Sequence, residues 1–533
     1  MIRMIGGEMP EYAEEHPPAG GVLFRHLLDR LPTGIRVLVA GPHDAGLISA
    51  LAERRDVTCL VRSQPDATTI PDVTVLCGTL SKLTDADRYD LVIALDGVGR
   101  LCSPEDTPLD WAESVRVLAR SLRPGGTLLL TVENELGVHR LVDPGTPTAA
   151  RAGDAWRPLG EYGDTPGRPD RLAAVLAAEG LPVAALAAAW PLPFSPTLLV
   201  TPETLGRGPL DALAALAAAA VSPVYAGRPV LSDPRRLAAS AVRRGIGAEL
   251  APAWLVVAQR ATRPGPAVVP LPPALFAGPS GTVTEVVGTP DRGWLRRVVR
   301  GWSPVPPPVP GDSTGSRPGP PATGRQPGAP AGSPATDRHG GPTPSGPLPG
   351  GRLLEERLLS AAVGHELPAL RRLLTGWMTE LPMAAAGNVL VDGDRYALLD
   401  PAVPDQPDAL ARFAHTLLDG GYHHPWPGVT DPARLIAVLA GAAGLDTVPE
   451  TAGTDGPPGR REQEAQLDAL RQRLADAEER CRFFEIELEK REAELGRAKT
   501  QIAAFSGNLG YRAAKAGLVL ARAARNRIRK GRS

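Results

Sequence analysis

The chain has 533 residues, of which 43% are apolar, 22% are charged and 4% are aromatic. At about 150 residues per domain, this length predicts three or four folded units, and the apolar share excludes a wholly disordered chain. The 58 Lys and Arg residues nearly cancel the 59 Asp and Glu residues, so a general attraction for nucleic acid is excluded and any basic surface must be local.

Two segments rich in Pro and Gly divide the chain. Between Ser303 and Gly350, 15 of 48 residues are Pro, 10 are Gly and 9 are Ser or Thr, which is typical of a linker without a core. A shorter break covers residues 447–459. The predicted parts, in chain order, are a large domain over residues 20–262, a segment over 263–302, a disordered linker over 303–350, a smaller domain over 351–446, the short linker over 447–459, a coiled coil over 460–505 and a basic amphipathic helix over 508–533.

The large domain alternates short apolar runs with helical stretches. The apolar runs cover residues 35–42, 57–62, 73–78, 89–96 and 126–133. Such alternation predicts an α/β fold with a parallel, doubly wound sheet. Ligands of these sheets bind at the carboxyl ends of the strands, so we expect the pocket to be lined by the loops after Ala40, Val61, Cys77, Leu95 and Val132.

Two motifs in this domain resemble those of the class I S-adenosylmethionine-dependent methyltransferases. Tyr89-Asp90-Leu91-Val92 is similar to the family's fourth-strand motif, and residues 122–128 (LRPGGTL) are similar to its turn before the fifth strand. Residues 168–181 resemble the helix before the sixth strand, and residues 249–261 resemble the final antiparallel strand. The resemblance covers about residues 20–262 and implies a Rossmann-like sheet, S-adenosylmethionine as cofactor and methyltransferase activity.

The loop that would hold the cofactor departs from the family's pattern. The family's Gly-rich turn lets the backbone pass close under the methionine and ribose of the cofactor. Here Gly41 keeps the first glycine, while His43 and Ala45 replace the next two. Arg62 and Ser63 stand where the family has an acidic residue that binds the ribose hydroxyls, and Gly78-Thr79 replaces the acidic neighbour of the adenine amine.

Two interpretations of the domain follow. The resemblance implies a cofactor pocket formed by Gly41, Asp44, Gly46 and Asp96, with Glu133, Asn134 and His139 on the substrate side. In the alternative, the sheet is a scaffold, His43 is a loop residue and Asp96 caps the following segment. No catalytic base is assigned, because methyl transfer from a sulfonium can proceed by positioning of the acceptor alone.

The smaller domain begins with strongly helical residues 351–381, where apolar residues recur every three or four positions. Residues 387–401 then predict a hairpin that turns at Asp392-Gly393-Asp394 and carries Asn388 and Asp400 at its ends. This hairpin resembles the catalytic loop of aminoglycoside phosphotransferase-like kinases, an α+β fold in which the Asn and Asp hold magnesium.

The base and histidine of that kinase pattern are replaced by Met383 and Leu381. We therefore expect a pseudokinase-like module without a metal, in which Asn388 and Asp400 are vestigial positions. Residues 283–299, within the segment 263–302, are a candidate remnant of the kinase N-lobe. The alternative is an unrelated helical domain with one hairpin.

The tail carries a heptad pattern. Its seam residues are Leu467, Leu470, Leu474, Ala477, Cys481, Phe484, Leu488, Arg491, Leu495, Ala498, Ile502 and Phe505, with charges between them. A seam of more than five repeats predicts a coiled coil and hence self-association, with a dimer first and a trimer second. The alternative is one long helix packed on its own domain.

The last 26 residues carry eight Lys or Arg and no acidic residue. They predict a basic amphipathic helix after a break at Ser506-Gly507-Asn508, which indicates a peripheral anchor on the inner membrane face or a docking helix for an acidic partner such as a glycosyltransferase. Nucleic-acid binding is less favoured because only Tyr511 accompanies the charge. A solvated tail is the remaining alternative.

The order of the parts resembles that of the bifunctional methyltransferase-kinase chain terminators of O-antigen synthesis. This resemblance implies a role in cell-surface glycan assembly, with methyl transfer to a saccharide or glycolipid acceptor. The competing hypothesis is a non-catalytic scaffold that organises a membrane-associated glycosyltransferase complex.

The cysteines and the apolar runs bear on the compartment. Four scattered cysteines with no Cys-x-x-Cys pair argue against a disulfide framework and a thiolate zinc site, and they favour a reducing cytoplasm. The first residues lack the pattern of a secretory signal, and the longest purely apolar stretch, Ala212 to Val221, is too short to span a bilayer. We therefore expect a cytoplasmic protein, peripheral on the inner membrane face if the tail binds there.

Overall fold

The computed structural model describes every residue except 15, 71, 85–86, 105, 108, 144–164, 227, 229, 262–268, 292, 301–345, 446–459, 508 and 531–533. It divides into two compact units, residues 1–459 and 460–533. Most of the predicted Pro- and Gly-rich linker and all of the second linker lie outside the described residues.

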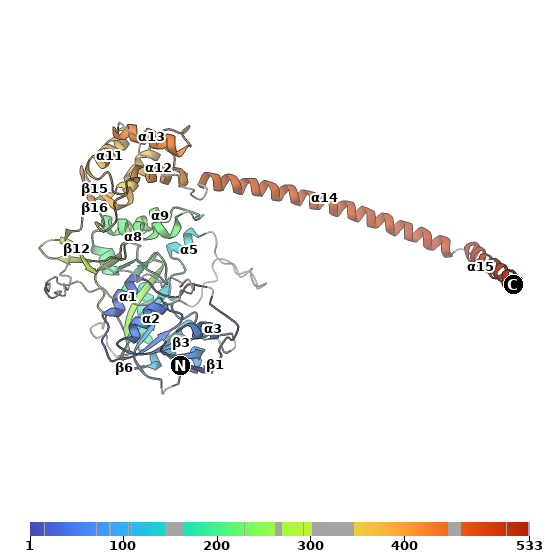
Figure 1. Cartoon of the computed structure of the whole chain (residues 1–533), viewed down its shortest axis with the longest axis horizontal. Helices are drawn as coiled ribbons and strands as arrows, with labels where there is room; N and C mark the ends of the chain where they lie inside the picture. Colours follow the sequence, from blue (N-terminus) through green and yellow to red (C-terminus); the bar gives the residue numbers. More distant parts are fainter. Residues whose placement is uncertain are drawn as a thin grey trace, which may run out of the picture. The chain divides into compact units, whose positions relative to one another are not determined.

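The first unit is built on a large mixed sheet with helices on both faces (Figure 1). Its strands are β1 (Ile2–Gly6), β2 (Arg36–Ala40), β3 (Asp56–Val61), β4 (Thr74–Gly78), β5 (Tyr89–Ala94), β6 (Leu122–Glu133), β7 (Val183–Trp190), β8 (Leu198–Val200), β9 (Ala253–Gln259), β10 (Ala274–Ala277), β11 (Val283–Thr289), β12 (Gly293–Arg300) and β13 (Gly346–Pro347). The helices that accompany them are α1 (Val22–Asp29), α2 (Ala45–Ala52), α3 (Gln64–Thr69), α4 (Trp111–Ser121), α5 (Val138–Val142), α6 (Pro169–Ala178), α7 (Pro202–Arg207), α8 (Leu210–Tyr225) and α9 (Pro234–Arg243), with a short 3-10 turn η1 (Leu80–Lys82).

The sheet has a doubly wound half and an antiparallel half. The described strands run in the order β1-β4-β3-β2-β5-β6-β9-β7-β8-β10-β11-β12-β13. Strands β1 to β6 are mutually parallel, whereas β9 is antiparallel to both β6 and β7. The order changes direction between β2 and β5, so the switch point at which such sheets bind ligands lies at the carboxyl ends of these two strands.

Successive side chains of the buried strands point to opposite faces of the sheet, and they build one core on each face. In β2, Val37 and Val39 face one core with α1 and α2, whereas Leu38 and Ala40 face a second core with α4 and α6. All four are fully buried. A continuous apolar strand of this kind is typical of a parallel sheet covered by helices on both sides, which explains why the predicted runs fold as strands.

The segment proposed as a kinase N-lobe remnant continues the large sheet. Strand β10 pairs antiparallel with β8, and β11 and β12 follow it outward. The buried carboxylate of Glu285 on β11 accepts a hydrogen bond of 2.9 Å from Arg30, the residue after α1. Strand β13 pairs with β12, bringing Gly346 and Pro347 of the predicted linker to the sheet edge. The structure thus joins this segment to the sheet.

The residues of the predicted smaller domain form a helical module with a short three-stranded sheet. Its elements are β14 (Arg352–Leu353), α10 (Leu354–Val363), α11 (Leu367–Glu380), the 3-10 turn η3 (Ala386–Asn388), β15 (Val389–Asp392), β16 (Arg395–Leu398), α12 (Ala409–Asp419) and α13 (Pro432–Ala443). Strands β15 and β16 form the predicted hairpin, which turns at Gly393-Asp394. Gly393 has a φ of +61°, a conformation that glycine adopts without strain.

Charged side chains join this module to α8 and α9, which lie between it and the large sheet (Figure 1). Arg235 of α9 contacts Asp233 and Glu355, and Tyr422 donates a hydrogen bond to Asp233. Arg243 likewise contacts Asp211 and Glu356 of α10. The side chains of Arg235, Asp233 and Glu355 are each less than a quarter exposed. Removal of the arginine would therefore leave two largely buried carboxylates without their cation.

The second unit consists of two helices, α14 (Arg460–Gly507) and α15 (Leu509–Lys530). The end of α14 falls at the predicted break. The seam residues Leu470, Leu474, Leu488, Leu495 and Ile502 are 56–67% exposed. Pairing of this seam with a second copy stays a prediction. In the part of the chain that the structure describes, no helix combines the length and apolarity needed to cross a membrane.

Candidate functional site

The carboxyl ends of β2 and β5 bring two of the predicted cofactor residues together. Gly41 follows β2 with a φ of +93°, and a Cβ atom placed on it would lie 3.5 Å from Cβ of Asp96. A residue with a Cβ atom at position 41 would be strained by the positive φ, and its Cβ would lie in ordinary van der Waals contact with Asp96. The positive φ of Gly41 is the backbone conformation that glycine adopts without strain, as in a Gly-rich cofactor loop.

The other two predicted cofactor residues lie at the start of α2. Asp44 is the N-cap of this helix, and its carboxylate accepts a hydrogen bond of 3.0 Å from the backbone N–H of Leu47. Gly46 follows within the first turn. Asp44 therefore acts on its own helix, stabilising its N-terminus by about 1 kcal/mol.

His43 connects the loops after β2 and β5. Its Nδ1–H donates to the carbonyl oxygen of Gly41 at 2.9 Å, and its Nε2 accepts from the backbone N–H of Leu95 at 3.2 Å. Burial lowers the pKa of His43 to about 4, so the imidazole is neutral at pH 7. His43, which replaces the family's second glycine, thus lies in the loop between β2 and α2 with its side chain buried and hydrogen-bonded to both neighbouring strand ends.

Asp96 forms an ion pair instead of capping the next segment. Arg100 donates to both of its carboxylate oxygens, from Nε at 2.6 Å and from Nη2. The Asp96 side chain is 5% exposed. Burial raises the pKa of Asp96, and the contact with Arg100 offsets this only in part. Any ligand that approaches Asp96 must compete with a guanidinium already in place.

Arg62, after β3, replaces the acidic residue of the family, and its guanidinium pairs with the carboxylate of Glu14. Glu14 accepts hydrogen bonds from Arg62 Nε at 2.7 Å and Nη2 at 3.2 Å. Arg62 Nη1 donates to the carbonyl oxygen of Cys102 at 2.7 Å, and the guanidinium lies 5.5 Å from the ring centroid of Tyr12. Burial works against this charge, but Glu14 raises the pKa of Arg62 above its ordinary value.

Sequence reasoning missed Glu14 and Arg100. The sequence predicts a domain that begins at residue 20 and indicates no role for the segment before it. Glu14 and Arg62 are 48 residues apart, and no periodic pattern links them. Glu14 stands among Glu8, Glu11 and Glu15 in the sequence, so no local signal singles it out.

The S-adenosylmethionine site implied by the resemblance therefore fits this chain in part. Gly41 beside Asp96 suits a cofactor that passes under the loop after β2. At β3 the fit fails, because Arg62 and Glu14 use their polar atoms on each other. The residues that would hold the cofactor are those at the ends of β2 and β5.

On the predicted substrate side, Glu133 and His139 form a partly exposed pair, whereas Asn134 is buried. Glu133, at the end of β6, accepts hydrogen bonds from His139 Nε2 at 2.9 Å and from Arg140 Nε at 2.9 Å. Burial opposes its charge, but His139 and Arg140 lower the pKa of Glu133 to about 2. This pair is partly exposed, and Glu133 is 40% exposed.

Asn134 is buried and has a structural role. Its amide nitrogen donates to the carbonyl oxygens of Glu249 at 2.6 Å and Ala251 at 2.8 Å, and its oxygen accepts from the N–H of Leu136. These bonds tie the loop after β6 to the chain entering β9. Both N–H groups of the buried Asn134 amide are therefore used within the fold.

Asn388 and Asp400, the vestigial kinase positions, close the hairpin on each other. The amide of Asn388 donates to the carbonyl oxygen of Asp400 at 2.8 Å and accepts from its N–H at 2.9 Å. Burial raises the pKa of the Asp400 carboxyl. Among the described residues, no group of three or more His, Cys, Asp or Glu is placed to hold a metal. Asn388 and Asp400 therefore have a structural role, since their hydrogen bonds hold the two ends of the hairpin together.

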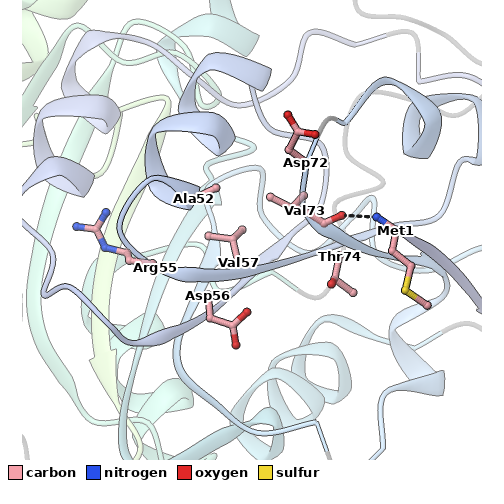
Figure 2. A pocket seen from close by; sticks show the side chains of 8 residues that line it. All are labelled: Met1, Ala52, Arg55, Asp56, Val57, Asp72, Val73 and Thr74. Carbon is pink, nitrogen blue, oxygen red and sulfur yellow. Dashed lines mark hydrogen bonds between the residues drawn. The ribbon is translucent and has the colours of Figure 1, made fainter.

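A surface hollow of about 420 Å³ lies at the opposite, amino ends of β3 and β4 (Figure 2). It is lined by Met1, Ala52, Arg55, Asp56, Val57, Asp72, Val73 and Thr74. The N-terminal ammonium donates to the carbonyl oxygen of Val73 at 2.9 Å. Arg55 donates instead to carbonyl oxygens of Leu28, Leu31 and Pro32. The hollow is distant from the switch point and offers no convergent side chains.

Comparison with known proteins gives fold-level likeness only. No protein-family model matches the chain. No curated protein matches it either. Among solved structures, an S-adenosylmethionine-dependent methyltransferase from Mesorhizobium loti is 15% identical over 45% of this chain and 99% of its own, with a TM-score of 0.26. The 1,6-didemethyltoxoflavin-N1-methyltransferase of Burkholderia thailandensis is 15% identical over 43% of this chain and 72% of its own, with a TM-score of 0.21. Identities and scores this low assign no activity.

Proposed function

We propose that residues 20–262 form an S-adenosylmethionine-dependent methyltransferase domain that acts on a saccharide or glycolipid acceptor. The observation that carries the proposal is the sheet itself. Its order β4-β3-β2-β5-β6-β9-β7, with β9 antiparallel, sets Gly41 against Asp96 at the switch point. The acceptor class is supported by the order of the chain's parts.

The chain's own residues supply position and charge in this proposal. Gly41 lets a ligand lie against the loop, and Arg100 holds the Asp96 carboxylate at the end of β5. When bound, the cofactor supplies the methyl group as an electrophilic sulfonium. The Glu133–His139 pair at the end of β6 is the candidate contact for the acceptor.

The second candidate function is a non-catalytic scaffold of a glycosyltransferase complex. It is supported by the mutual pairing of Arg62 with Glu14 and of Asp96 with Arg100, which leaves the site satisfied without a ligand. In both candidates we propose self-association through α14, and contact of the basic helix α15 with a membrane surface or an acidic partner.

Calorimetric titration of S-adenosylmethionine into the full-length protein separates the two candidates. The test variant is Gly41→Leu, and the control is Gly34→Leu, because Gly34 has a φ of +72° with no atom near its Cβ position. Both variants carry backbone strain of about 1–3 kcal/mol, but only the first obstructs the site. Binding lost in Gly41→Leu and kept in Gly34→Leu supports the enzyme. Absence of cofactor binding at millimolar concentration, by the folded full-length protein and by its Glu14→Gln variant, refutes it in favour of the scaffold.

A further inference from the structure

We propose that the N-terminal strap, residues 9–14 and 16–20, is a built-in plug over the carboxyl-end site, clamped by Glu14, which must open before the cofactor enters. The inference rests on the proposed function, since it names a device that regulates that same site. It assigns a role to a segment for which the fold alone gives no reason.

The strap is hydrogen-bonded to the loops after three neighbouring strands. At β3, the N–H of Met9 donates to the carbonyl oxygen of Arg62 at 2.8 Å, and Ser63 Oγ donates to that of Tyr12 at 2.6 Å. At β2, the N–H of Ala19 donates to the carbonyl oxygen of Pro42 at 3.0 Å.

After β5, Arg100 reaches the same strap. Its guanidinium donates to the carbonyl oxygens of His16 and Pro17, each at 3.1 Å. The strap therefore crosses the ends of β3, β5 and β2, where an open α/β sheet binds its ligand.

Glu14 is the clamp. Its side chain is 5% exposed, it forms two hydrogen bonds with Arg62, and its Oε2 lies 3.9 Å from Arg100 Nη1. Two guanidinium groups from different loops thus face one carboxylate of the strap. Charge-assisted hydrogen bonds are about twice as strong as neutral ones, so the closed strap is favoured until a ligand competes with it.

A rival interpretation makes Glu14 a ligand group, which would replace the acidic residue missing after β3. The geometry favours the plug, because both Glu14 oxygens already accept from Arg62. The two interpretations predict opposite effects of removing the charge. Under the plug, the apparent affinity is the intrinsic affinity multiplied by the open fraction, so a weaker clamp raises it.

The test compares the full-length protein with Glu14→Gln and with Glu11→Gln, a matched control on the exposed part of the same strap. Hydrogen exchange of the strap is followed by mass spectrometry, and S-adenosylmethionine affinity by calorimetry. Because a hydrogen bond to a charged group contributes about 1.5–3 kcal/mol, we expect exchange and affinity to rise at least about tenfold in Glu14→Gln and to stay unchanged in Glu11→Gln. Saturating cofactor should speed strap exchange in the unmodified protein.

The outcomes distinguish the plug from the proposed function. Weaker cofactor binding by Glu14→Gln overturns the plug and makes Glu14 a ligand group, while the methyltransferase stands. Unchanged strap exchange in Glu14→Gln also overturns the plug. Faster exchange in Glu14→Gln, with no cofactor binding by any of the three proteins, keeps the clamp and refutes the methyltransferase.

Discussion

Replacing His43 by Gln should remove a defined part of the pH dependence of the protein's stability. In the folded chain the imidazole is buried, donates to Gly41 and accepts from Leu95. Protonation would bury a charge and would turn Nε2 from an acceptor into a donor facing the Leu95 N–H. Both effects stabilise the neutral form of the imidazole over the protonated form in the folded chain.

The magnitude follows from the pKa of His43, which burial lowers from 6.5 to about 4. Between these values the unfolded chain binds the proton and the folded chain does not, so stability falls as the pH falls. From about pH 7 to about pH 5, this single group should cost about 2 kcal/mol of unfolding free energy. Below about pH 4 both states are protonated and the effect levels off.

The assay is urea unfolding of the full-length protein at the two pH values, followed by circular dichroism. Three proteins are compared: unmodified, His43→Gln, and His16→Gln as a control at an exposed histidine. The loss of stability on acidification should be about 2 kcal/mol smaller in His43→Gln than in the other two proteins. An equal loss in all three would refute the placement of His43 as a buried neutral link.

Two further predictions concern packing and assembly. Arg235→Met leaves Asp233 and Glu355 without their cation and should lower the unfolding free energy by about 3 kcal/mol, whereas the exposed Arg244→Met should change it little; equal effects in denaturant unfolding would contradict the buried pair. Leu488→Lys on the heptad seam should convert the oligomer to monomer in light scattering, and Ile486→Lys, equally exposed off the seam, should not. A monomeric unmodified protein would refute the coiled coil.

The parts of the fold that depend on local periodicity were predictable from sequence. The parallel strands and the hairpin of β15 and β16 lie where apolar runs and a Gly-containing turn indicate them, and β9 lies where the family resemblance implies the final antiparallel strand. Extended apolar runs fold as strands because alternate residues enter cores on both faces.

The contacts that decide the candidate site were not predictable in this way. Glu14 meets Arg62 only because β1 docks at the sheet edge and leads the following residues across the strand ends. His43 is buried because Leu95, 52 residues later, offers an N–H to its ring. Such pairings depend on tertiary geometry, which residue spacing does not encode.

The pairing of β12 with β13 changes what the Pro- and Gly-rich segment can do. Leu295 lies opposite Pro347 and Arg296 lies opposite Gly346. The chain therefore leaves the sheet after β12 and rejoins it as β13, the strand next to β12. Arg300 and Gly346, which flank this segment in the chain, therefore lie on adjacent strands of one sheet. Because hydrogen bonds within the sheet hold these two flanking strands together, the spacing of the elements of the first unit depends on the sheet and not on the length of the chain between β12 and β13.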